Sequence, residues 1–239
     1  MGTTMQKMMF GATIAALLIA AAIPASAATM VSANGTPLSE TIKTNVGGNG
    51  TSIDFFSDPS HLKVVYSSTS TLSPSSQGGF AFVQGVSGAG FTNLTLTPDN
   101  FTFSDIKFNM KLPADSGGPS IPNGYKTDFT FDTTVFFSGG GSQLFSNDVG
   151  NGTGQNRFII TGSVGEAISK IVFSNLVGTS TKNNNPTLIN AYNFDSLRQV
   201  SFDAVSGVPE PGTWALFILG FGAIGMMLRS GRGLAHARA

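Results

Sequence analysis

Side chains that could carry out nucleophilic or acid–base chemistry are scarce in this sequence. The 239-residue chain has two histidines and no cysteine. A Ser-His-Asp hydrolase would have to use His61, because the other histidine, His236, lies next to the C-terminal end, and no G-x-S-x-G nucleophile elbow is present. The absence of cysteine excludes disulfides, thiolate metal sites and a cysteine nucleophile. We therefore predict no catalytic residues and no enzymatic activity.

The carboxylates offer a second route to chemistry. Of the 13 Asp and Glu residues, all but Glu210 lie between Glu40 and Asp203. A glycosidase needs two facing carboxylates at a set separation, and many pairs here could serve, so an exported glycosidase stays open as an alternative. Residues 146–154 are rich in oxygen ligands but lack the acidic spacing of a calcium loop, and Ile159 occupies the place of its last glutamate. We predict no metal site and no cofactor, with a structural calcium ion elsewhere as the alternative.

The C-terminal segment has three parts with distinct physical properties. It opens on the prolines of Val208-Pro209-Glu210-Pro211, which keep the chain from starting a helix there. An uncharged stretch follows over residues 214–228. As a helix, its 15 residues would span roughly 22 Å, against about 30 Å of bilayer core. Arginines close the chain, and the positive-inside rule places that end in the cytoplasm. We predict a short single transmembrane helix with its Pro-Glu-Pro end outside.

This pattern resembles the PEP-CTERM sorting tail in its Pro-Glu-Pro-x-x-Trp-Ala form. The resemblance implies recognition by an exosortase, a membrane enzyme, in a Gram-negative bacterium that exports exopolysaccharide. The arginines are more dispersed here than in the family's tight cluster. The residues that match are Pro209, Glu210, Pro211, Trp214, Ala215, Gly220, Phe221, Gly222, Gly225 and Arg229, with Arg232 following. The G-x-G-x-x-G at 220–225 lies within the apolar span and lacks the strand and acidic residue of a dinucleotide site.

The N-terminal segment has the pattern of a secretory signal peptide. Lys7 gives a positive start, an apolar run covers residues 8–23, and Pro24 ends it. The small residues Ala25 and Ala27 form an Ala-x-Ala cleavage site, so the mature chain would begin at Ala28. We therefore divide the chain into a signal peptide (1–27), an exported domain (28–205), a sorting tail (206–232) and a short cytoplasmic tail (233–239).

The exported domain is predicted to be all-β. Short apolar–polar alternations recur along it, for example in residues 125–138, where Phe129, Phe131, Val135 and Phe137 fall on one face. A phase slip at Ser104-Asp105 predicts a β-bulge or a tight turn. About ten such runs favour a two-sheet sandwich, and its closing strands resemble those of jelly-roll domains in PEP-CTERM proteins. Low-complexity stretches at 67–79, 138–142, 147–156 and 179–185 are predicted to be loops.

These properties favour a non-enzymatic surface or exopolysaccharide-matrix protein with a structural or adhesive role. It would cross the inner membrane, be anchored there transiently and then reach the cell surface or extracellular matrix. The formal net charge is zero, so we expect no nucleic-acid partner. The alternative is a carbohydrate-binding module, which predicts exposed aromatic side chains, with Tyr66, Tyr125, Tyr192 and Phe136 as candidates. The absence of a regular Thr-x-Thr ladder argues against an ice-binding role.

Overall fold

The computed structural model of the protein describes residues 27–33, 36–112, 126–151, 156–182, 185–206, 218–222 and 224. Thirteen strands and one 3₁₀ turn make up the folded domain within these residues. They are β1 (Ala28–Ser32), β2 (Glu40–Val46), β3 (Gly50–Asp58), β4 (Lys63–Gln77), β5 (Phe80–Gly85), η1 (Val86–Gly88), β6 (Leu94–Pro98), β7 (Phe101–Lys111), β8 (Lys126–Phe137), β9 (Ser142–Asn151), β10 (Asn156–Gly162), β11 (Ile168–Lys182), β12 (Asn185–Ala191) and β13 (Ser196–Ser206).

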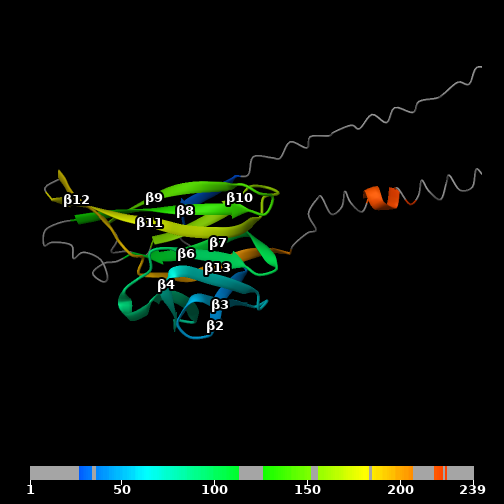
Figure 1. Ribbon diagram of the computed structural model, residues 1–239, viewed down its shortest axis with the longest axis horizontal. Coiled ribbons are helices and arrows are strands. Elements are labelled where there is room, and N and C mark those ends of the chain that lie inside the picture. Colours follow the sequence, from blue (N-terminus) through cyan, green and yellow to red (C-terminus); the bar gives the residue numbers. More distant parts are fainter. Residues whose placement is uncertain are drawn as a thin grey trace, which may run out of the picture.

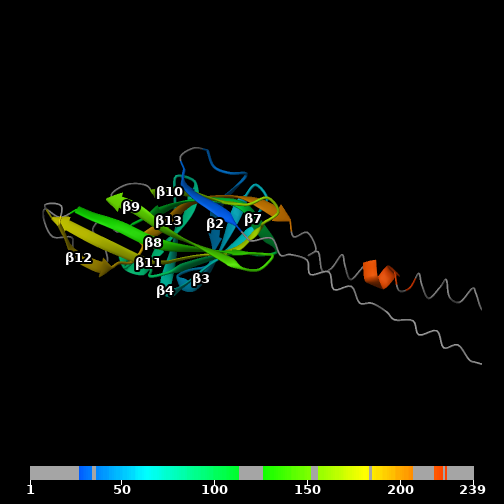
Figure 2. The same ribbon diagram turned by 90° about the horizontal axis from the view of Figure 1, so that it is seen from above.

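The strands form one antiparallel hydrogen-bonded path that folds back on itself. Its order is β1-β10-β7-β13-β2-β3-β4-β6-β11-β8-β9, with β5 pairing both β13 and β4. We call β1, β10, β7, β13 and β2 layer one, and β3, β4, β6, β11, β8 and β9 layer two. Figure 1 shows β8, β11, β6 and β4 following one another across the domain, and Figure 2 shows the two layers from above. The predicted all-β architecture is confirmed.

Phenylalanine rings fill the space between the layers. Phe158 of β10 meets Phe131 of β8 with ring centroids 5.6 Å apart, and Phe108 of β7 meets Phe173 of β11 at 4.9 Å. These contacts join strands of opposite layers, so they show that the inner faces pack against each other. Aromatic pairs of this kind add about 0.5–1.5 kcal/mol each beyond their buried area. The inward phenylalanines of β8 are those that the alternation predicts.

Of the two features predicted at Ser104-Asp105, the structure has the β-bulge. Asp203 of β13 pairs with Asp105 of β7, whereas the next residue, Ala204, pairs with Phe103. Ser104 is therefore the extra residue, and the side-chain alternation of β7 shifts by one position there. After the bulge, Ile106, Phe108 and Met110 are buried in the core.

Three of the four predicted loops are wrong. Strand β4 continues through the serine-rich stretch to Gln77, where it pairs with β5. Strand β9 occupies much of 147–156, and β11 and β12 form a hairpin over most of 179–185. The stretch at 138–142 contains the expected turn, between β8 and β9, and the last two residues of the first stretch, Gly78 and Gly79, form the turn between β4 and β5. Serine, threonine and asparagine suit a strand when one face is exposed and a neighbouring strand satisfies its backbone.

Candidate functional site

Both described ends of the folded domain lie at the same end of layer one. Ala28 opens β1 opposite Gly162 of β10, and Ser206 closes β13 opposite Phe101 of β7. The strand register shows that these two ends lie at the same level. Asp105 of β7 pairs with Thr161 of β10 on one side and with Asp203 of β13 on the other. We call this the tail end of the domain. In Figure 1 the blue start and the orange finish of the domain both point toward its right-hand side.

The beginning of β1 is held on both sides. Ala28 is 6% exposed, and its backbone N–H donates to Oε1 of Gln143 in β9 at 2.7 Å. The carbonyl of Ala27 accepts a hydrogen bond from the backbone of Ser163 at 3.0 Å. Since β1 and β9 are the two open edges of the strand path, Gln143 links them across the opening. Of the predicted cleavage residues, Ala27 and Ala28 are described, and Ala25 lies outside the described residues.

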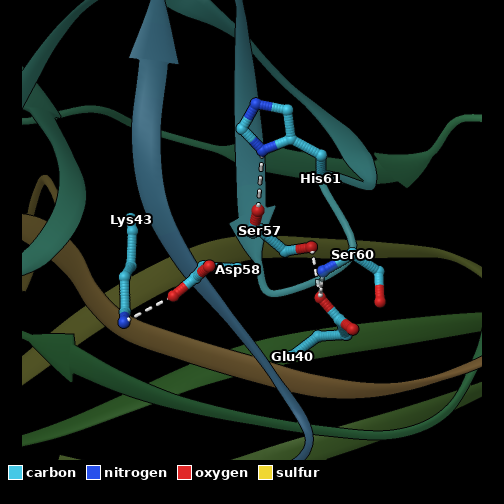
Figure 3. A network of polar contacts seen from close by, with 6 residues as sticks. All are labelled: Glu40, Lys43, Ser57, Asp58, Ser60 and His61. Atoms are coloured by element: carbon cyan, nitrogen blue, oxygen red, sulfur yellow. Dashed lines mark hydrogen bonds and ion pairs between the residues drawn. The ribbon is translucent and has the colours of Figure 1, made fainter.

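A polar network surrounds Glu40 at the tail end (Figure 3). Glu40 is 5% exposed, and its Oε2 accepts hydrogen bonds from Oγ of Ser57 at 2.6 Å and from the backbone N–H of Ser60 at 3.2 Å. Burial raises the pKa of the carboxyl group, but the hydrogen bonds from Ser57 and Ser60 outweigh it and hold the pKa below its ordinary value. A neighbouring ion pair joins Lys43 to Asp58 at 2.8 Å.

His61 stands beside this network without activating a nucleophile. Its Nδ1 lies 3.4 Å from the backbone carbonyl of Ser57, whereas the Ser57 hydroxyl donates to Glu40 and accepts from the N–H of Leu62. Figure 3 shows the imidazole directed away from Glu40. A serine nucleophile needs its hydroxyl bonded to the base, so Ser57 and His61 are not arranged as a catalytic pair.

The other predicted chemistry-bearing groups are dispersed. Among the described residues, no group of three or more histidines and carboxylates lies close enough to hold a metal ion. Lys63 pairs with Asp99 at 2.8 Å and lies 3.7 Å from Asp54, and Lys111 pairs with Asp195 at 2.7 Å. These carboxylates each face a lysine on the surface of the sandwich.

The predicted aromatic binding face is wrong for two of its four members. Tyr66 is 1% exposed and packs on Phe55 with ring centroids 4.4 Å apart. Burial raises the pKa of its hydroxyl, which has no hydrogen-bond partner among the residues that the structure describes. Tyr192 is 7% exposed and meets the edge of Phe129. Phe136 is half-buried with Lys170 Nζ 4.0 Å from its ring centre, and the side chain of Tyr125 lies outside the described residues.

The described part of the tail, residues 218–222 and 224, is helical. It contains Gly220, Phe221 and Gly222 of the predicted motif; the other motif residues, Pro209, Glu210, Pro211, Trp214, Ala215, Gly225, Arg229 and Arg232, lie outside the described residues. Its side chains at Ile218, Leu219, Phe221 and Ile224 are 55–71% exposed. No helix in the described residues is long and apolar enough to cross a membrane, so the transmembrane span over 214–228 stays a prediction.

The comparison with family models decides the identity of this tail. Residues 207–232 match the PEP-CTERM protein-sorting motif. The chain carries a PEP-CTERM sorting signal. The motif implies export and sorting to the cell surface, with processing by an exosortase. The PEP-CTERM match begins directly after Ser206, the last residue of β13. Neither the curated proteins nor the solved structures contain a match to the chain.

Sequence patterns missed one group of residues. Lys107 and Asn109 of β7 are polar and face away from the core, yet they are 8% and 3% exposed. Polar residues on an outward strand face normally indicate exposure to solvent. Here Nζ of Lys107 donates to the carbonyl of Thr36 in the connection between β1 and β2, and Nδ2 of Asn109 donates to Gln199. The one signal in the sequence is the strict alternation of Ile106, Phe108 and Met110 with these polar residues.

Proposed function

We propose that the chain is an exported surface or exopolysaccharide-matrix protein whose β-sandwich has a structural or adhesive, non-enzymatic role. The observation that carries the proposal is the PEP-CTERM motif at 207–232, which follows the last strand of the domain without an intervening segment. An exosortase acting there would release the sandwich intact. A jelly-roll-like topology of the sandwich is part of this proposal.

The placement of the domain ends supports this route. A signal segment before Ala28 and a sorting tail after Ser206 would both reach one membrane from the tail end of the domain. The chain would not have to cross the sandwich to do so. The domain would then stand on the periplasmic side of the inner membrane until the tail is processed.

The described helix of the tail fits a transient membrane anchor. Exposed isoleucine, leucine and phenylalanine side chains on one short helix leave apolar surface in water. The transfer of each such side chain from water to an apolar environment is favourable by about 1.5–3 kcal/mol of free energy. The arginines that follow would hold the far end at the cytoplasmic interface. In this proposal, Pro209, Glu210 and Pro211 present an extended segment outside the bilayer to the exosortase.

The test is localisation and intact mass in isogenic cells with and without an exosortase. We expect surface or matrix protein that begins at Ala28 and ends within 207–213 only when the enzyme is present. The triple variant Pro209→Ala, Glu210→Ala and Pro211→Ala should keep its tail and stay with the inner membrane. A matched control, Pro119→Ala, Pro122→Ala and Glu166→Ala, changes the same residue types outside the motif and should be processed normally. Equal processing of both variants, or a full tail in both strains, would contradict the proposal.

A further inference from the structure

The turn between β10 and β11 presents an apolar side chain at the tail end of the domain. Val164, at its outer corner, is fully exposed, with a relative accessibility of 106%. The backbone N–H of Glu166 donates to the carbonyl of Ser163 at 2.8 Å, and Gly165 has a left-handed φ of 86°. This hydrogen bond together with a glycine of positive φ at the third position is typical of a type II turn. The turn therefore has a defined shape, with the valine directed outward.

Two neighbouring segments hold this turn in place. The N–H of Ser163 donates to the carbonyl of Ala27, just before β1, at 3.0 Å. On the other side, the carbonyl of Ala167 accepts from the N–H of Ser138, in the turn between β8 and β9, at 2.8 Å. The β10–β11 turn is thus fixed against the start of the domain and against the β8–β9 turn.

The strand register places Val164 level with the point where the sorting tail leaves the domain. Thr161 of β10, Asp105 of β7 and Asp203 of β13 lie side by side. Both β10 and β13 are antiparallel to β7, so both run toward the tail end. Val164 comes three positions after Thr161, and Ser206 comes three positions after Asp203. Since β7 alone lies between these strands, two strand spacings of roughly 10 Å in total separate them.

The tether keeps the turn close to the membrane that the proposed function assigns to the tail. Residues 207–213 separate Ser206 from the uncharged stretch, and fully extended they reach roughly 25 Å. A tethered group has a high effective concentration at the surface to which it is tethered, so a weak contact suffices. Burying one valine shifts an equilibrium between two orientations about tenfold.

The opposite end of the domain carries a second exposed valine. Val46, the last residue of β2, is 64% exposed. Strand β2 is antiparallel to β13, with Glu40 opposite Phe202, so it runs away from the tail end. Its seven residues span roughly 20 Å. Val46 is therefore an exposed valine that the tether does not bring to the membrane.

We propose that the β10–β11 turn contacts the lipid surface of the inner membrane while the sorting tail is anchored there. Val164 enters the boundary between headgroups and acyl chains, and the domain then stands with its tail end on the periplasmic leaflet. The inference rests on the proposed function, because it needs the tail in the bilayer. It adds a second, reversible contact that orients the domain during processing and is lost once the tail is cut.

Nitroxide quenching of a single fluorophore tests this contact. Because the chain has no cysteine, Val164→Cys and Val46→Cys can each carry one NBD label. The full chain is reconstituted into phosphatidylcholine vesicles that contain a nitroxide-labelled lipid. We expect a large loss of emission from the label at position 164 and little loss at position 46. Equal quenching at both positions, or none at position 164, in chains that float with the vesicles would overturn the contact and leave the anchor standing. Chains that do not float with the vesicles would contradict the membrane anchor, and with it this inference.

A second pair of variants separates an apolar contact from nearness alone. Ser138→Cys places the label on the exposed β8–β9 turn beside the valine, so Val164 itself stays in place. In this labelled chain, Val164→Asp should lower the fraction of lipid-contacting domains about tenfold, whereas Val164→Leu should keep it. Both variants should keep the parent's unfolding temperature, because the Val164 side chain is fully exposed. Unchanged quenching in folded Val164→Asp would show that the tether alone brings the turn to the lipid and would overturn the role of Val164.

Discussion

Glu40 is a buried carboxylate whose ionised form is favoured by its hydrogen bonds. Ser57 and Ser60 keep its pKa below the ordinary glutamate value of 4.5 in the folded domain. The unfolded chain therefore takes up a proton at this position at higher pH than the folded chain does. The resulting stabilisation is complete above pH 4.5 and is lost as the pH falls through 4.5 and then through the lower pKa of the folded state.

The variant Glu40→Gln tests this dependence. At pH 7 it should lower the free energy of unfolding by about 2 kcal/mol, because hydrogen bonds to a charged group are replaced by neutral ones. Below pH 4.5 the difference from the unmodified chain should shrink, and urea unfolding across pH 3–7 measures it. Glu166→Gln, in the turn between β10 and β11, is the matched control. A difference that stays constant with pH would show that the ionised form of Glu40 is not favoured.

At the scale of elements, the segment between β5 and β6 depends on a close backbone approach. After η1 the chain returns to Gly85, and a Cβ at Gly85 would overlap the carbonyl of Gly90. The approach is fixed by Phe91, which exchanges backbone hydrogen bonds with Phe194 at 2.9 Å in each direction. Gly85 has a φ of −71°, which any residue can adopt. Glycine is required at this position because it has no side chain.

Gly85→Ala should therefore lower the free energy of unfolding by about 1–3 kcal/mol through overpacking. Gly48→Ala is the matched control, because a Cβ at Gly48 meets nothing within 4 Å. It should change stability by less than about 0.5 kcal/mol. The midpoints of urea unfolding compare the two. Equal midpoints would mean that the β5–β6 segment can move away from Gly85 without cost.

At the scale of the whole molecule, the strand path has two open edges, β1 and β9, and the start of β1 closes the gap between them. The hydrogen bond from the Ala28 backbone to Gln143 is the link. If the signal peptide is removed before Ala28, the mature chain begins at this contact. The N-terminus of the mature protein is then part of the sandwich.

Gln143→Ala should remove this link and cost about 1 kcal/mol, the usual net value of one hydrogen bond. The loss should appear as faster hydrogen exchange in the β1–β10 ladder, with other strands little affected. Gln84→Ala is the control, since the half-buried Gln84 side chain makes no hydrogen bond within the described residues. Unchanged exchange in β1 would show that the pairing with β10 holds the edge by itself.

The sequence by itself determined the features that depend on local pattern. The alternation around Phe131 predicts an inward face because the side chains of a strand alternate. The phase slip at Ser104 predicts an interruption of the strand, either a bulge or a tight turn, for the same reason. The sorting tail is also readable from the sequence, since Pro-Glu-Pro, an apolar stretch and arginines follow one another along the chain. These signals need no contact between distant residues.

Only the tertiary structure decided what the sandwich buries and what it brings together. Tyr66 and Tyr192 are aromatic residues of the kind that form binding faces, but packing in the folded domain makes them core residues. The serine-rich part of β4 becomes a strand because β5 pairs with it. Lys107 and Arg157 are 50 positions apart in the sequence, and they share a cavity because β7 pairs with β10 and the connection before β2 covers both. Such placement is set by long-range pairing, which no local periodicity encodes.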